Sequence, residues 1–221
     1  MTSDPHLRED DAPHDAMGTV LLELAEQLAA ARDRYDELVE WRSANGATTE
    51  LASDHRLNHK PFYYERNGWR PGKLLKGQPK PDTDYVEDFF DDSGHWIATC
   101  EHTVPVQSVY YYEEFFERSG TAMYGTRFDY YVPDKKPINA SRASFSGDLI
   151  ADHAERRQDG WWYEVYRRDQ RGRVAAIECV QFQHVYHEEP ASSIVHIEYD
   201  GEGLRAIRET WSDRDELLYR R

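Results

Sequence analysis

The sequence predicts a mostly β protein of the α+β class, in which a curved antiparallel β-meander packs on one long N-terminal helix. Three observations support this prediction. Apolar residues near the N-terminus repeat at helical spacing, the repeat changes to a period of two from about residue 85, and glycine-containing turn motifs recur between the later segments. The 15 Tyr, 8 Phe and 6 Trp residues also favour strands.

The N-terminal part is predicted to contain a polar tail and one helix. Residues 1–14 are rich in Asp, Glu, His and Pro, so we expect a disordered acidic tail. An amphipathic helix is predicted over about residues 16–44, and Asn45-Gly46 ends it. Its apolar stripe consists of Met17, Leu21, Leu24, Leu28, Ala31, Tyr35 and Leu38. Such a stripe can pair with a second chain, but its length favours packing on a sheet.

Residues 46–84 are predicted to form an irregular connection, because their later part is rich in Gly, Pro and Lys. Residues 85–221 then follow as the meander. We expect residues 15–221 to form a single domain, since 221 residues are ample for one core.

The turns of the meander are predicted from a short motif. Alternating residues on either side of Glu117–Gly120 indicate two strands joined by a tight turn. Glycine suits the last turn position because that residue must adopt a positive φ. An Asp at the first position can bond backbone amides two or more residues later. The motif recurs at Asp91–Gly94, Asp169–Gly172 and Asp200–Gly203, which predicts a sheet of roughly eight to ten strands.

Two of these units carry a resemblance to a known repeat. Residues 168–177, RDQRGRVAAI, and residues 199–207, YDGEGLRAI, resemble the YD repeats of Rhs-type proteins. Looser matches extend the resemblance over parts of residues 85–211. The resemblance implies a local structure of consecutive antiparallel hairpins and implies no catalytic residues. The chain is too short for the enclosing shell that such repeats build in full-length members.

The charge and motif content narrow the class of function. A net charge of −15 repels nucleic-acid phosphates and anionic membrane surfaces, but it suits a basic protein partner. The chain has two cysteines and no apolar run of membrane-spanning length, so we expect a cytoplasmic protein. No metal-ligand spacing, phosphate-binding loop or nucleophile motif occurs, and we expect no metal and no cofactor.

The first functional hypothesis is a non-enzymatic interaction protein. A compact acidic chain without catalytic motifs fits a bacterial immunity or inhibitor-type protein that binds a basic effector through an acidic face. Tyrosines beside the acids would serve as anchors, because Tyr is a frequent hot-spot residue. The residues expected on this face are Asp88, Asp91, Asp92, Tyr110, Tyr111, Tyr112, Glu113 and Glu114.

The alternative is a small-molecule-binding or enzymatic curved sheet with a polar and aromatic pocket beneath the helix. Glu164, Glu178, Glu198 and His196 lie within otherwise apolar strand segments, and their convergence would support acid–base chemistry. If they point to solvent instead, they are ordinary surface residues of a one-sided sheet. A third hypothesis is self-association of the helix through the Met17–Leu38 stripe.

Overall fold

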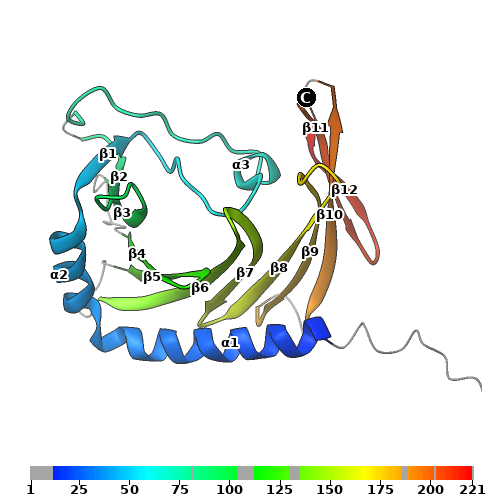
Figure 1. Cartoon of the computed structure of the whole chain (residues 1–221), viewed down its shortest axis with the longest axis horizontal. Helices are drawn as coiled ribbons and strands as arrows, with labels where there is room; N and C mark the ends of the chain where they lie inside the picture. Colours follow the sequence, from blue (N-terminus) through cyan, green and yellow to red (C-terminus); the bar gives the residue numbers. More distant parts are fainter. Residues whose placement is uncertain are drawn as a thin grey trace, which may run out of the picture.

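The computed structural model describes residues 12–80, 82–103, 112–129, 135–185, 189–201 and 203–220, with the backbone alone for residues 12–15. Within these residues, twelve strands join one antiparallel sheet, and their spatial order is their order along the chain. The sheet curls into an open trough (Figure 1). The strands are β1 (Thr48–Ala52), β2 (Tyr85–Phe90), β3 (Trp96–His102), β4 (Tyr112–Ser119), β5 (Ala122–Asp129), β6 (Lys136–Ser146), β7 (Leu149–Arg157), β8 (Gly160–Arg168), β9 (Val174–Gln183), β10 (Ala191–Asp200), β11 (Gly203–Trp211) and β12 (Asp215–Arg220).

The turns have the predicted geometry. The turn Asp169–Gly172 shows it in full: the carboxylate of Asp169 accepts hydrogen bonds from the amides of Arg171 and Arg173, at 2.8 and 3.0 Å, and the amide of Gly172 donates to the Asp169 carbonyl at 2.9 Å. Gly147, with φ 63°, marks a further turn of this kind between β6 and β7. The four predicted turn glycines also have positive φ: Gly94 77°, Gly120 59°, Gly172 78° and Gly203 124°.

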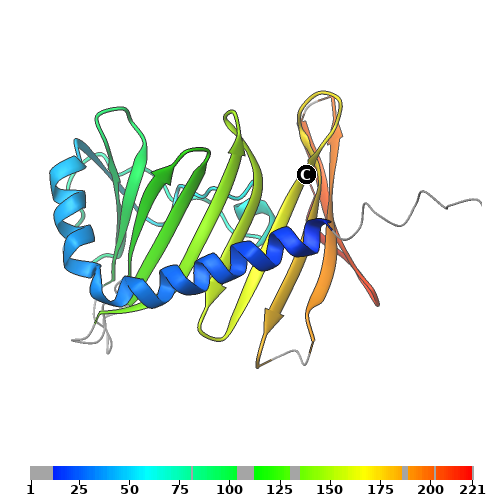
Figure 2. The same ribbon diagram turned by 60° about the horizontal axis from the view of Figure 1, so that its bottom comes forward.

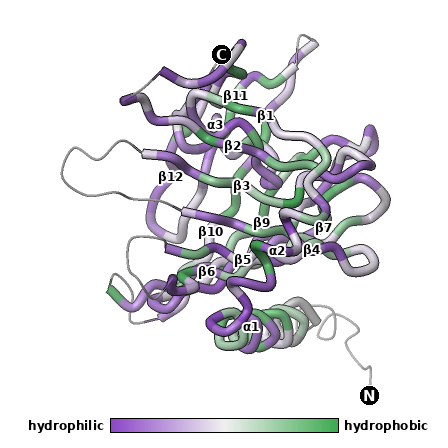
Figure 3. Tube along the Cα trace, turned by 90° about the vertical axis from the view of Figure 1, so that its left-hand side faces the viewer, coloured by the Kyte–Doolittle hydropathy of each residue, from purple (hydrophilic) through white to green (hydrophobic). Residues whose placement is uncertain are grey.

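Two helices joined by a 3₁₀ turn cover one face of the sheet, here called the outer face. They are α1 (Ala12–Ala30), η1 (Ala31–Asp33) and α2 (Tyr35–Asn45). α1 crosses diagonally over the middle strands and contacts β6 and β7 (Figure 2). Leu24 is fully buried and packs with Ala140 and Ala154, whose small side chains let the helix approach the sheet closely. The side view in Figure 3 shows hydrophobic and hydrophilic positions mixed along α1, as its one-sided burial requires.

α2 covers the outer face near β3 to β5. Tyr35 and Leu38 pack on Phe115 and Phe128, and the Tyr35 and Phe128 rings meet edge to face at 5.1 Å. The predicted single helix over residues 16–44 is therefore wrong in one respect, because η1 breaks it. The helical stripe continues across the break, but α1 and α2 lie on different strands, so the chain has to change direction between them.

The opposite, concave side is here called the inner face. The connection, residues 53–84, leaves β1, extends across the open side of the trough to the short helix α3 (Tyr63–Arg66), and returns (Figure 1). Its two arms pair near β1, where the amide of Ser53 donates to Lys73 and the amide of Leu75 donates to Leu51. An apolar core, which includes Phe116, Ile177 and Ile207, fills the trough, and Phe62 packs against it from the connection.

The mostly β class, the meander and the long N-terminal helix are confirmed. The region 46–84, predicted as irregular throughout, contains β1 and α3, and the sheet has twelve strands instead of eight to ten. β1 was not predicted because it is a short edge strand. Its pairing with β2 depends on residues about 40 positions away, as in Thr48 with Phe90 and Thr49 with Phe89. The helix begins at Ala12, inside the predicted tail, and residues 1–11 lie outside the described part. No helix in the described ranges is long and apolar enough to cross a membrane.

Candidate functional site

The inner face carries ionisable side chains beside its apolar core. Successive side chains of a strand point to opposite faces, and the strand register places Glu114, Arg127, Glu155 and Glu164 on the inner face. The connection lies over them, and most of it is neither helix nor strand. Its polar groups therefore need partners from the sheet. This is where the fold brings reactive groups together.

Two buried ion pairs hold the connection in the trough. Lys60 Nζ lies 3.4 Å from Glu155 Oε2, and Arg66 Nη1 lies 3.0 Å from Glu164 Oε1. Asn139 Nδ2 donates a further hydrogen bond to Glu155 at 2.8 Å. Burial alone would raise the pKa of each carboxyl, but the charge of Lys60 and the neighbouring arginines, Arg157 for Glu155 and Arg66 for Glu164, together outweigh burial, and both pKa values are lowered to about 2. Both groups are therefore ionised at neutral pH.

Two neutral histidines lie beside these ion pairs. Burial lowers the pKa of His59 and of His153 to about 3, and the nearby charge of Lys60 acts in the same direction on both. His59 Nε2 and His153 Nδ1 have no hydrogen-bond partner within the described part of the chain. The ring of His59 packs against those of Trp96 and Phe116, at 4.6 and 5.0 Å. Protonation of either ring would place a charge in a buried site.

A cavity of about 380 Å³ lies between the connection and strands β3 to β5, and we call it the inner cavity. This volume is in the range of small-molecule sites. Four aromatic side chains line it: Tyr63 and Tyr64 of α3, Trp69 of the connection and Trp96 of β3. The Tyr63 and Trp69 rings lie 5.7 Å apart, and Trp69 is 59% exposed although it is large and apolar. An aromatic wall of this kind favours a flat or cationic ligand group.

One carboxyl in the inner cavity has no partner. His55 and Arg127 also line the cavity, but both bind Glu101, with His55 Nε2 at 2.7 Å from Glu101 Oε1. Glu114 makes no hydrogen bond or ion pair with any described residue. Burial raises the pKa of Glu114, and Arg127 opposes that rise. Glu114 is therefore a group in the cavity that is able to accept a hydrogen bond, pair with a cation or exchange a proton.

A smaller cavity of about 240 Å³ lies farther along the inner face, where Glu164 and Cys179 are among the lining residues. Burial raises the pKa of Cys179 to about 12, and Glu164 adds to this effect. The thiol is therefore protonated at neutral pH, which does not suit a nucleophile.

The four residues of the alternative catalytic prediction do not converge. Only Glu164 lies on the inner face. Glu178 and Glu198 lie on the outer face and pair with arginines of neighbouring strands, at 2.7 and 3.2 Å, and His196 is exposed on the same face. The polar and aromatic cavity also lies beneath the connection, on the opposite side of the sheet from the helix that was expected to cover it.

The residues expected on an acidic face are separated by the fold. Asp88 is 1% exposed and accepts a hydrogen bond from Thr99 at 2.6 Å. Glu113 is 3% exposed and pairs with Arg42 at 2.8 Å beneath α2. Glu114 faces the inner cavity, and Tyr112 lies under the guanidinium of Arg127. Asp91 and Asp92 lie at the β2–β3 turn, and Tyr110 and Tyr111 fall outside the described residues.

Sequence reasoning missed the residues that the connection contributes, above all His55, Lys60, Arg66 and Trp69. A signal was present: residues 55–69, HRLNHKPFYYERNGW, contain five basic or histidine residues and four aromatic residues within an acidic chain. Such a segment favours packing on carboxylates over exposure in a loop.

No protein-family model, curated protein or solved structure matches this chain. Among the described residues, no group of three or more His, Cys, Asp or Glu side chains is arranged to hold a metal ion. Inference about function therefore depends on the geometry of the inner face.

Proposed function

We propose that this protein binds a small organic ligand in the inner cavity. The observation that carries the proposal is the combination of an unpartnered carboxyl, Glu114, and an exposed aromatic side chain, Trp69, on the walls of one cavity of about 380 Å³. Partially exposed aromatic residues and a few convergent polar groups are typical of ligand sites.

The charges around the cavity favour a ligand with an amine or another cationic nitrogen group. His55 and Arg127 are already paired with Glu101, so Glu114 is the anionic group left for a ligand. Asp54 also lines the cavity. The ligand's cation would pair with Glu114 while its apolar part packs on Trp69 and Trp96. Because burial raises the pKa of Glu114, lowering the pH should protonate this carboxyl and weaken the binding of a cation.

The test is a titration with aromatic amines, each matched with its uncharged N-acetyl form, followed by tryptophan fluorescence and calorimetry. We expect saturable binding of the amines, loss of at least tenfold in affinity in Glu114→Gln, and a similar loss in Trp69→Ala. Glu178→Gln, on the outer face, is the matched control and should bind as the parent protein does. Equal binding of amines and acetylated analogues, or full affinity in both cavity variants, would overturn the proposal.

A second candidate is an immunity or inhibitor-type protein that binds a basic effector. The net charge of −15 and the exposed acids at the turns, Asp92 and Asp148, favour it. The test is calorimetric titration against purified basic proteins encoded by neighbouring genes. We expect salt-dependent binding that Asp92→Lys and Asp148→Lys together weaken. Absence of binding throughout that set, or affinity independent of both charges, would exclude this candidate.

A further inference from the structure

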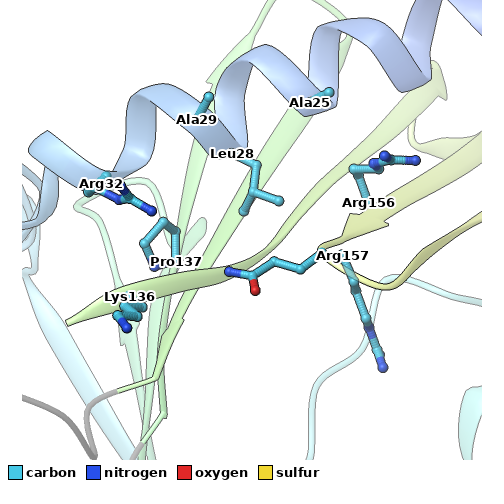
Figure 4. A pocket seen from close by; sticks show the side chains of 9 residues that line it. Ala25, Leu28, Ala29, Arg32, Lys136, Pro137, Arg156 and Arg157 are labelled. Atoms are coloured by element: carbon cyan, nitrogen blue, oxygen red, sulfur yellow. The ribbon is translucent and has the colours of Figure 1, made fainter. Parts of the chain in front are cut away.

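A third cavity lies on the outer face, at the C-terminal end of α1. It has a volume of about 370 Å³, and we call it the basic groove. Its apolar wall includes Leu28 of α1 and Pro137 of β6. Four cationic residues line it, and three of them are Arg32 of η1, Lys136 of β6 and Arg156 of β7 (Figure 4). Groups from three separate elements therefore meet around one apolar depression.

The three cations have no partner within the described part of the chain. None of them makes a hydrogen bond or an ion pair there. Arginines packed elsewhere on the protein do pair with acids, such as Arg167 with Glu178 at 2.7 Å. The chain contains 42 acidic and 27 basic residues, so a groove bordered by three unpaired bases is unusual for its composition.

Neither the position of Arg157 nor the charge at the end of α1 explains the unpaired positive charge around the groove. Arg157 also borders it, but this side chain points away (Figure 4), bonds Glu155 at 2.7 Å and lies over the Trp162 ring, so its role is to support the inner face. The C-terminal end of α1 is equivalent to about half a negative charge, which offsets only part of three positive charges. Most of the positive charge remains available to a ligand.

We propose that the basic groove binds a small organic anion, with its carboxylate or phosphate group beside the cations Arg32, Lys136 and Arg156 that border the groove and its apolar part on Leu28 and Pro137. Guanidinium groups bind both kinds of anion through paired hydrogen bonds. The size of the groove suits a ligand of a few carbon atoms, and the overall charge of −15 disfavours a polyanion. The groove and the inner cavity lie on opposite faces, so this inference does not depend on the proposed function.

The test compares three probes by calorimetry and by backbone amide chemical shifts: hexanoate, uncharged hexanamide and inorganic phosphate. Hexanoate should bind, hexanamide should bind at least tenfold more weakly, and phosphate should show how much of the affinity the anion supplies alone. Binding of hexanoate should weaken as salt is raised, because Arg32 and Lys136 are exposed. Shifts should concentrate at the end of α1 and at the start of β6.

Variants then assign the site. Lys136→Gln and Arg156→Gln should each weaken hexanoate binding by about tenfold. Arg205→Gln removes an exposed positive charge from β11 and should leave binding unchanged. Circular dichroism shows whether each variant is folded, and the salt dependence of the parent protein is a readout that requires no variant. Equal affinity for hexanoate and hexanamide, no binding at millimolar concentration, or full affinity in both groove variants would overturn the inference.

Discussion

The two faces of the sheet are covered in different ways. On the outer face α1 satisfies its own backbone hydrogen bonds and packs mainly through apolar contacts such as Leu24 on Ala140, and one buried ion pair, Arg42 with Glu113, lies beneath α2. On the inner face an irregular connection is held by ion pairs, Lys60 with Glu155 and Arg66 with Glu164. The comparison teaches that an irregular cover brings charge into the interior and leaves space beside it. Buried charge and unfilled space are what a binding site requires.

The largest effect is expected from breaking an ion pair of the inner face. Glu164→Gln leaves Arg66 with uncompensated charge in a buried site, and we expect the free energy of unfolding to fall by about 3–5 kcal/mol. Urea denaturation measures it. Glu178→Gln, which breaks an exposed pair on the outer face, should cost less than about 1 kcal/mol. Equal losses would contradict the difference drawn between the faces.

The next effect concerns the apolar cover of the outer face. Leu24→Ala removes a fully buried side chain beneath α1, and we expect a loss of about 2–4 kcal/mol in the free energy of unfolding. Leu22→Ala, at a residue that is 70% exposed on the same helix, should change it by less than about 0.5 kcal/mol. Similar losses of stability in both variants would mean that α1 does not pack on the sheet through the side that carries Leu24.

The pH dependence of stability should arise on the inner face. His59 and His153 stay neutral in the folded protein, with pKa values of about 3, but take up protons when unfolded below about pH 6.5. Stability should therefore fall as the pH is lowered from about 6.5 to 5, by up to ~1.4 kcal/mol per pH unit for each histidine. Burial lowers the pKa of His55, but the hydrogen bond and the charge of Glu101 outweigh burial and raise this pKa above its ordinary value. His55 therefore contributes stability that increases as the pH falls, which is the opposite of the effect of His59 and His153.

Below about pH 4.5 the carboxyls of Glu155 and Glu164 add to the loss, because their pKa values of about 2 lie below those of the unfolded chain. Denaturation midpoints between pH 7.5 and 5 measure the histidine effect. The double variant His59→Gln and His153→Gln should flatten the slope, whereas His196→Gln, at an exposed outer-face site, should not. An unchanged slope in the double variant would assign the pH dependence to other groups.

The smallest effect is expected from a polar contact of the outer face. Gln27 Nε2 donates to the Gly125 carbonyl at 3.1 Å and to Thr126 Oγ1 at 2.9 Å. Gln27→Ala should lower the free energy of unfolding by about 1 kcal/mol, because α1 depends mainly on apolar contacts. Glu26→Ala, at an exposed neighbouring position, serves as the control. A loss as large as that of Glu164→Gln would show that polar contacts hold both faces equally.

The sequence predicted those features that depend on local physics. The turn at Asp169–Gly172 is specified within five residues, by a carboxylate that binds nearby amides and a glycine with φ 78°. The helix follows from one apolar stripe. The meander follows in part because tight turns pair neighbouring strands, as the positive-φ glycines Gly94, Gly120, Gly147, Gly172 and Gly203 do for β2–β3, β4–β5, β6–β7, β8–β9 and β10–β11.

The inner cavity could not be predicted because it depends on contacts between distant residues. Lys60 meets Glu155 across 95 positions of sequence. The register of β8 and β9 determines which face of the sheet Glu164 and Glu178 occupy. It places Glu164 opposite Cys179 and Glu178 opposite Val165. A displacement of one residue would have exchanged their faces. The expected acidic face could not be predicted correctly for the same reason, because Asp88 and Glu113 are buried in the interior.

The position of α1 has a consequence for synthesis of the chain. Leu24 leaves the ribosome well before Ala140 and Ala154, the residues that bury it. At ordinary translation rates the delay is on the order of ten seconds. During this interval the apolar stripe of the nascent helix has no strand to cover it, and it stays exposed until β6 and β7 have been synthesised.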